Sequence, residues 1–196
     1  MLNFAAAVFF LIITPGPGVL SAAGVSAAYG FRAGWRYILG LAIGNNLVAL
    51  TVISGLAALI LAYPAIRTGL LFVSTAYLIY LAARIALADS KIGFITAQGQ
   101  PGIKEGFLLQ PINPKAYAVS TFIFSGFPIY EGSYATEAGI KLLIFNAIWF
   151  PLHILWVWFG VAIRKLELPA KTQRAINFAM ATSMLIVVGL ALWSIQ

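Results

Sequence analysis

The chain has 196 residues, of which 62% are hydrophobic and 9% are charged, whereas soluble domains carry about 25% charged residues. A water-soluble core of this size cannot hide so much apolar surface, so we predict an integral membrane protein and read the net charge of +7 as a sign of membrane topology rather than of nucleic-acid binding. The absence of cysteine excludes disulfides, thiolate metal sites and thiol redox chemistry.

Six apolar stretches are long enough to cross a bilayer, which takes about 20 residues as a helix. They predict an all-α integral membrane fold with six transmembrane helices. We interpret the first stretch as a membrane helix rather than a cleaved signal peptide, because no basic segment precedes it. The stretches are approximately Leu2–Ala28, Tyr37–Leu61, Ala65–Leu87, Gly106–Gly126, Gly139–Ile163 and Ile176–Ile195.

Prolines interrupt the first and the fourth of these stretches. The first contains Thr14–Gly18 (TPGPG) and the fourth contains Gln110–Lys115 (QPINPK). Proline lacks an N–H and clashes with the preceding turn, so each break frees backbone carbonyls. In lipid such groups persist only where they are buried in protein or line a cavity, and secondary transporters build substrate sites from helices of this kind. The two breaks therefore make the chain a candidate carrier.

The connections divide the chain into two sets of three helices within one transmembrane domain, residues 1–196. The halves are about 1–88 and 105–196, and the linker 89–104 is charged and contains Pro101 and Gly102. Each half opens with a proline-broken helix. Because three is odd, the second half must run with the opposite membrane orientation, which predicts a 3+3 inverted repeat.

The basic residues of the loops predict the orientation. One side of the membrane collects nine of them, whereas the other side has Arg67 and Lys141, and Lys115 lies inside the fourth stretch. The first side is therefore predicted to be cytoplasmic, and both termini lie outside. The nine residues are Arg32, Arg36, Arg84, Lys91, Lys104, Arg164, Lys165, Lys171 and Arg174.

Lys115 and the break in the first helix are the strongest candidates for binding an anion. A lysine within a span costs about 2.5–3.5 kcal/mol, so it usually faces the protein interior or water. Lys115 therefore either pairs with an anion such as a substrate carboxylate or extends to the cytoplasmic interface. The helix that follows Pro15 and Pro17 presents N–H groups that suit a carboxylate, and Thr14 adds a hydroxyl.

Amide side chains and one histidine complete the candidate polar residues. Asn45 and Asn46 either hold helices together or line a path. His153 either relays protons or serves a hydrogen-bonded structural role. The remaining amides that could join such a lining are Gln110, Asn113 and Asn146.

No acidic residue is expected inside any span. There is no carboxylate pair, histidine-rich metal set or serine nucleophile motif, so the sequence predicts neither an enzyme, a cofactor nor a metal site.

Several motifs occur together in an order that resembles the LysE/RhtB family of amino-acid exporters. They are the Thr14–Pro17 motif, the glycines 30, 34, 40 and 44, the stretch Tyr77–Leu81 and the Asn113–Ala116 motif. The resemblance implies export of an amino acid or close derivative across the bacterial inner membrane. The wider group also contains thiol-electron carriers and metal exporters, against which the absence of cysteine argues.

Two positions depart from that family pattern. Gly18 stands where the family usually has Asn or Asp, and Asn45 stands where it often has Asp. Both changes remove polar or charged atoms and indicate a less common substrate.

Together these observations predict a multi-pass inner-membrane exporter whose partners are an amino acid and the lipid bilayer. The alternatives are a passive channel, a metal-ion exporter and a non-transporting membrane subunit. Oligomeric state stays open, a homo-oligomer included. The predicted substrate-binding residues are Thr14, Pro15, Gly16, Pro17, Gly18, Asn45, Asn46, Asn113, Pro114 and Lys115, with His153 as the candidate proton relay.

Overall fold

All regular secondary structure in the described part of the chain is α-helical, which confirms the all-α part of the predicted fold class. The computed structural model describes residues 1–14, 16–87, 99–166 and 169–193, so Pro15 and most of the predicted linker lie outside it. In chain order the helices are α1 (Leu2–Ile13), α2 (Pro17–Tyr29), α3 (Phe31–Ile53), α4 (Leu56–Leu61), α5 (Pro64–Ala86), α7 (Ile103–Ile112), α8 (Pro114–Gly126), α9 (Tyr134–Lys165) and α10 (Ala170–Trp193).

Some of these helices have the length and hydropathy of membrane spans. Within the described ranges, α3 and α9 are each long and apolar enough to cross a bilayer. Helices α1 and α2 meet the same criteria together, as one span bent by 52°. The apolar faces of these helices remain exposed in the isolated chain, as expected when lipid covers them.

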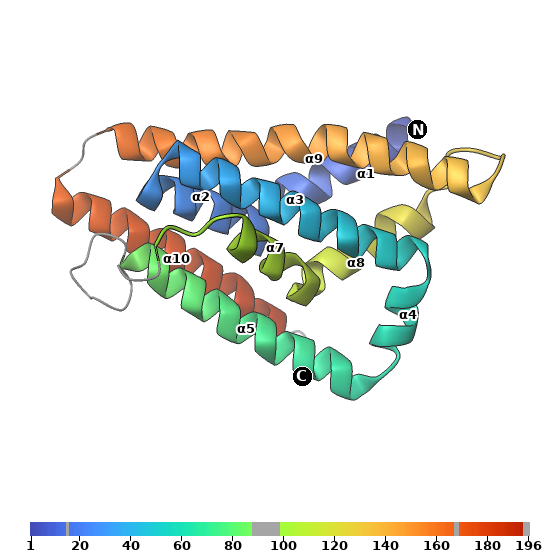
Figure 1. Cartoon of the computed structure of the whole chain (residues 1–196), viewed down its shortest axis with the longest axis horizontal. Helices are drawn as coiled ribbons and strands as arrows, with labels where there is room; N and C mark the ends of the chain where they lie inside the picture. Colours follow the sequence, from blue (N-terminus) through green and yellow to red (C-terminus); the bar gives the residue numbers. More distant parts are fainter. Residues whose placement is uncertain (15, 88–98, 167–168, 194–196) are drawn as a thin grey trace.

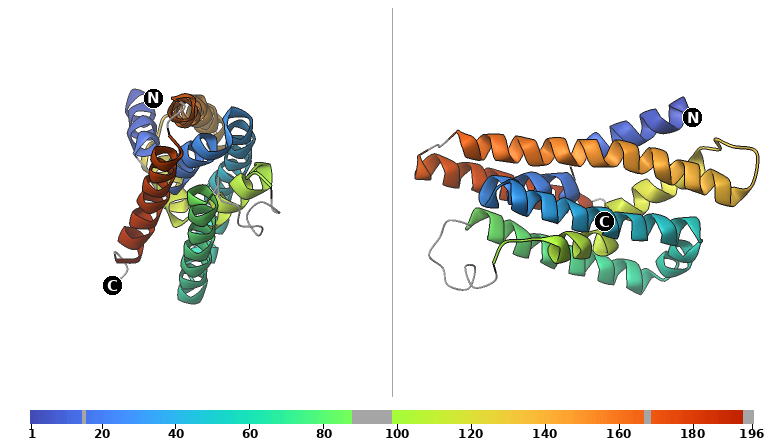
Figure 2. Two further views of the ribbon diagram at one scale, coloured as in Figure 1. Left: turned by 90° about the vertical axis from the view of Figure 1, so that its left-hand side faces the viewer. Right: turned by 45° about the horizontal axis from the view of Figure 1, so that its top comes forward.

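Each of the two long helices supports one pair of short helices (Figure 1). Helices α1 and α2 lie end to end along α9, and α7 and α8 lie end to end along α3. Both junctions fall near the middle of the long axis of the molecule. The end-on view in Figure 2 shows α5 and α10 projecting from the group that the other helices form. This arrangement sets the two junctions inside the bundle, far from either end.

The α3–α7 contact depends on glycine. A methyl group at Gly40 would lie 2.0 Å from the carbonyl oxygen of Ile103, and one at Gly106 would lie 2.1 Å from the carbonyl oxygen of Tyr37. Neither separation is sterically allowed, so the two backbones approach too closely for any side chain at these positions. Such contacts replace the hydrophobic force that is missing between helices in lipid.

We expect Gly106→Ala to lower the thermal stability of the protein in detergent. The added methyl group clashes with a backbone carbonyl that cannot rotate away, and overpacking of this kind costs about 1–3 kcal/mol. The matched control is Gly139→Ala in α9, where a methyl group meets nothing within 4 Å, so its melting temperature should be unchanged or slightly raised. Equal melting temperatures for both variants would contradict this account of the α3–α7 contact.

Candidate functional site

The first junction separates α1 from α2 and leaves backbone groups of both helices without intrahelical partners. Helix α1 ends at Ile13, and Thr14 is its C-cap in extended conformation. Helix α2 starts with Pro17, whose fixed φ suits the first helical position, and Gly16 is its extended N-cap. The first N–H groups of a helix have no carbonyl to bond, so the start of α2 presents donors and a partial positive charge.

The second junction separates α7 from α8 and is closed by a side chain. Asn113 caps α8, because its side-chain oxygen accepts a hydrogen bond of 3.1 Å from the backbone N–H of Lys115. Pro114 occupies the first helical position. On the other side of the break, the hydroxyl of Tyr117 donates to the carbonyl of Pro111 at 2.9 Å. The polar side chains of this break therefore satisfy its own backbone groups.

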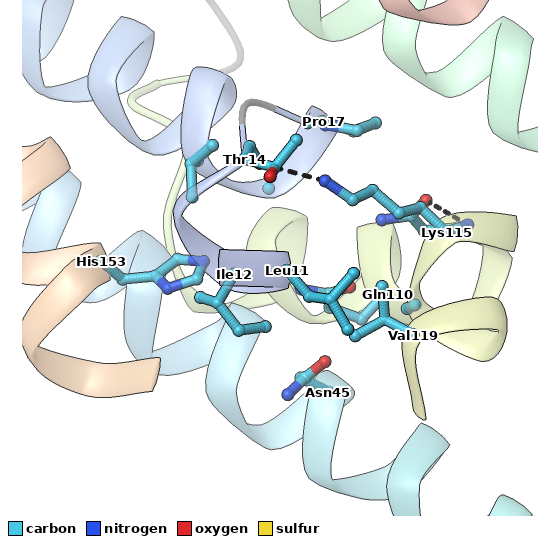
Figure 3. A pocket seen from close by; sticks show the side chains of 14 residues that line it. Leu11, Ile12, Thr14, Pro17, Asn45, Gln110, Lys115, Val119 and His153 are labelled. Atoms are coloured by element: carbon cyan, nitrogen blue, oxygen red, sulfur yellow. Dashed lines mark hydrogen bonds between the residues drawn. The ribbon is translucent and has the colours of Figure 1, made fainter. Parts of the chain in front are cut away.

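Lys115 joins the two junctions (Figure 3). Its ammonium donates a hydrogen bond of 3.0 Å to the carbonyl oxygen of Thr14, the C-cap residue of α1. Gly16 makes room for this approach, since a methyl group there would lie 2.7 Å from Nζ. The positive charge thus lies at the C-terminal end of α1, where the helix dipole favours a cation, and beside the N-terminus of α2.

A pocket of about 50 Å³ opens at the point where the two junctions meet. It accommodates only a few water molecules, so a solute the size of leucine requires the surrounding helices to move apart, and we call this narrow arrangement the closed form. Of the predicted binding residues, Thr14, Gly16, Pro17, Gly18, Asn45, Asn113 and Lys115 line it. The remaining lining residues are Leu11, Ile12, Val19, Gln110, Ala116, Val119 and His153.

Asn45 is the one lining residue whose buried polar atom has no partner among the described residues. Its side chain is 5% exposed, and its Nδ2 donates no hydrogen bond. An unpaired buried donor costs about 1–3 kcal/mol, so it normally marks a place where water or a ligand binds. The nearby Gln110 is also buried, with 4% of its surface exposed.

His153 enters the pocket from α9. Its ring stacks on that of Trp149 at a centroid distance of 3.5 Å, and its Nδ1 lies 2.9 Å from the carbonyl oxygen of Trp149. The side chain is 3% exposed. These contacts give His153 a fixed orientation at the pocket wall, and the proton-relay role stays a prediction.

The structure places two predicted residues outside the pocket lining, while Pro15 lies outside the described residues. Asn46 points away and forms a reciprocal amide pair with Asn146, with both hydrogen bonds at 2.8 Å. This pair joins α3 to α9, which is the structural alternative foreseen for an intramembrane amide. Pro114 begins α8, and its ring does not line the pocket.

Two further buried polar residues lie outside the set of predicted substrate-binding residues. Gln110, which the sequence indicates only as an amide that could join a polar lining, lines the pocket directly before the proline break. Lys141 is 5% exposed, donates to the carbonyl of Phe124 at 2.8 Å and pairs with Glu137 at 3.0 Å. The spacing of Glu137 and Lys141 by four residues was the signal for that pair.

Comparison with known proteins identifies the family. The profile of the LysE type translocator family matches residues 9–195. The chain is 28% identical over 166 residues to the uncharacterized membrane protein YrhP of Bacillus subtilis, an alignment that covers 78% of this chain and 77% of YrhP.

Two similar proteins carry names that state an activity. A leucine efflux protein of Klebsiella pneumoniae is 26% identical over 129 residues, which cover 62% of this chain and 61% of that protein. A cysteine/O-acetylserine efflux protein of Salmonella paratyphi A is 33% identical over 120 residues, which cover 57% of this chain and 59% of that protein. The chain therefore aligns with about three fifths of each. No solved structure matches the chain.

The amide pair between α3 and α9 predicts a coupled pattern of stability. Asn46→Leu or Asn146→Leu alone should destabilise the protein, because each leaves one amide unpaired within the bundle. The double variant should lose less free energy of unfolding than the sum of the two single variants. The difference, which is the coupling energy, should be about 0.6–1.7 kcal/mol, as found between membrane helices. Reversible unfolding of the four proteins in detergent measures this coupling, and strictly additive losses would contradict the pair.

Proposed function

The chain belongs to the LysE type translocator family, and on this basis we propose that it is a secondary carrier that exports an amino acid, or a close derivative of one, across the bacterial inner membrane. The observation that carries the proposal is the hydrogen bond between Lys115 and the carbonyl of Thr14, because it brings both broken helices to one pocket.

This junction has the properties needed to bind a carboxylate. Lys115 provides a cation, and the start of α2 at Pro17 provides backbone donors at the positive end of a helix dipole. Transporters commonly hold the carboxylate of a substrate at such interrupted helices near the middle of the membrane. The apolar side chains of Leu11, Ile12 and Val119 in the same pocket favour a substrate with an uncharged side chain.

We extend the proposal to the membrane arrangement. Six spans in a 3+3 inverted repeat would consist of α1 with α2, α3, α5, α7 with α8, α9 and α10. The nine-to-two distribution of basic residues supports an orientation with the C-terminal ends of α2, α5 and α9 in the cytoplasm and both termini outside. On this arrangement the pocket lies at mid-depth, and access alternates between the two sides.

The transport proposal is tested with purified protein in liposomes loaded with single amino acids, L-leucine and O-acetyl-L-serine among them. We expect saturable counterflow of at least one substrate, which separates a carrier from a passive channel. Lys115→Met should reduce this exchange about tenfold to a thousandfold, because a charge pair in a partly dry site is worth a few kcal/mol, and Lys115→Arg should retain part of it.

The matched control is Lys171→Met, which removes the same charge from an exposed position in α10 and should leave exchange unchanged. Full exchange by Lys115→Met would remove Lys115 from the site. The absence of counterflow for every amino acid in wild type would contradict the carrier proposal itself.

The orientation is tested by fusing reporter proteins to positions on the predicted opposite sides. A fusion at Gly99 should report the cytoplasm, and a fusion after Gln196 should report the outside, because Lys and Arg are retained on the cytoplasmic side. Alkaline phosphatase and green fluorescent protein at each site provide complementary readouts. The reverse pattern at either position would overturn the orientation.

A further inference from the structure

His153 presents one ring nitrogen to the pocket with a defined chemical role. Its Nδ1 lies 2.9 Å from the carbonyl oxygen of Trp149, and a carbonyl can only accept a hydrogen bond. Nδ1 therefore carries the proton, and in the neutral imidazole Nε2 carries a lone pair and acts as an acceptor. Among the described residues, no group donates a hydrogen bond to this Nε2.

Gly18 leaves open the space in front of that nitrogen. A methyl group at this position would lie 3.7 Å from Nε2 of His153 and 3.5 Å from Nε2 of Gln110. Both values are ordinary contact distances, so a methyl group would fit there without strain, and glycine leaves its place empty. Two polar side chains from α7 and α9 therefore face the same unfilled point in the pocket wall.

The unpaired amide of Asn45 is a second and independent sign that the pocket receives a ligand. Asn45 lines the same pocket, and its buried Nδ2 has no partner among the described residues. Buried amides are nearly always satisfied, so this donor requires an acceptor, such as a carboxylate oxygen, that the surrounding protein does not supply. Figure 3 shows Asn45 and His153 on different sides of Leu11 and Ile12, with Lys115 across from His153.

The pocket thus has a positive part and a neutral accepting part. Lys115 and the start of α2 attract a carboxylate, whereas none of the lining residues is an aspartate or glutamate. We propose that His153 Nε2 accepts a hydrogen bond from the ammonium group of the substrate and thereby makes the carrier selective for compounds with a free α-amine. This inference rests on the proposed function, since it presumes an amino-acid substrate.

The charge of the site explains why an uncharged acceptor suits the ammonium group of the substrate. A zwitterion adds no net charge to a pocket that already contains Lys115, and its ammonium group needs an acceptor with an available lone pair. His153 meets this requirement because the Trp149 carbonyl fixes its tautomer and the Trp149 ring holds its orientation. A substrate without the amine would leave the Nε2 lone pair of His153 unused.

The test compares amino acids with the same molecules lacking the amine. The pairs are L-leucine with 4-methylpentanoate, L-alanine with propanoate, and O-acetyl-L-serine with 3-acetoxypropanoate. Binding of each compound to the protein in nanodiscs is measured by thermal stabilisation, which does not require transport. Wild type should bind at least one amino acid ten or more times more tightly than its deaminated partner.

The measured quantity is the ratio of the affinity for an amino acid to the affinity for its deaminated partner. His153→Phe retains an aromatic ring against Trp149 and should lower this ratio to about one, because the amino acid binds more weakly while its deaminated partner binds as before. His153→Gln keeps an accepting atom and should retain part of the ratio. Gly18→Ala places a methyl group before Nε2 and should lower the ratio without loss of folding, so it tests the inference even if His153→Phe is not folded.

The inference is overturned if folded His153→Phe has the same affinity ratio as wild type. It is also overturned if His153→Phe binds both members of a pair equally more weakly, because a purely structural histidine would have that effect. An unchanged ratio in Gly18→Ala would also overturn it. Failure of wild type to bind or exchange any amino acid would overturn the proposed function and this inference together, and that failure appears without any variant.

Discussion

The backbone groups that proline frees at two places inside an apolar bundle are the constraint on which the rest of the structure depends. Such groups must find partners where water is scarce. The carbonyl of Thr14 is satisfied by the ammonium of Lys115, and the first N–H groups of α8 are covered by Asn113. The partner for one break therefore comes from the other, which ties the two broken helices together. Gly16 leaves room for this contact, since a methyl group there would force the ammonium to shift.

Much of this arrangement follows from sequence alone because its signals are local. Apolar length marks the helices, and proline marks where they stop, so the junctions after Ile13 and Ile112 lie at the predicted motifs. Polar residues are rare in apolar segments, which singles out Asn113 and Lys115 as residues with a specific role. Local sequence signals do not predict that the two junctions meet. Their meeting depends on contacts between distant segments, in which α1 and α2 lie along α9 and α7 and α8 lie along α3.

The direction of individual side chains could not be predicted, because it depends on how each helix is rotated. Asn45 and Asn46 are adjacent and point about 100° apart on a helix. The sequence does not say which of them faces the first junction. The close approach of α3 and α7 at Gly40 and Gly106 fixes that rotation, so Asn45 reaches the pocket and Asn46 meets Asn146 on α9. A rotation of α3 by one residue would point Asn46 toward the pocket in place of Asn45 and would leave Asn146 without its amide partner.

The contact between Lys115 and Thr14 also bears on how a carrier of this kind changes state. A ligand shifts a conformational equilibrium only when it interacts differently with the two states. In the closed form the ammonium is held by the end of α1, and a substrate carboxylate would compete with that carbonyl for the same donors. Binding would then weaken the bond that joins α1 to α8 while a new anion is held at the start of α2. On the proposed function, Lys115 would therefore both bind the carboxylate and release one broken helix from the other. Substrate binding would thus act directly on the hydrogen bond between Lys115 and Thr14, which joins the two helices in the closed form.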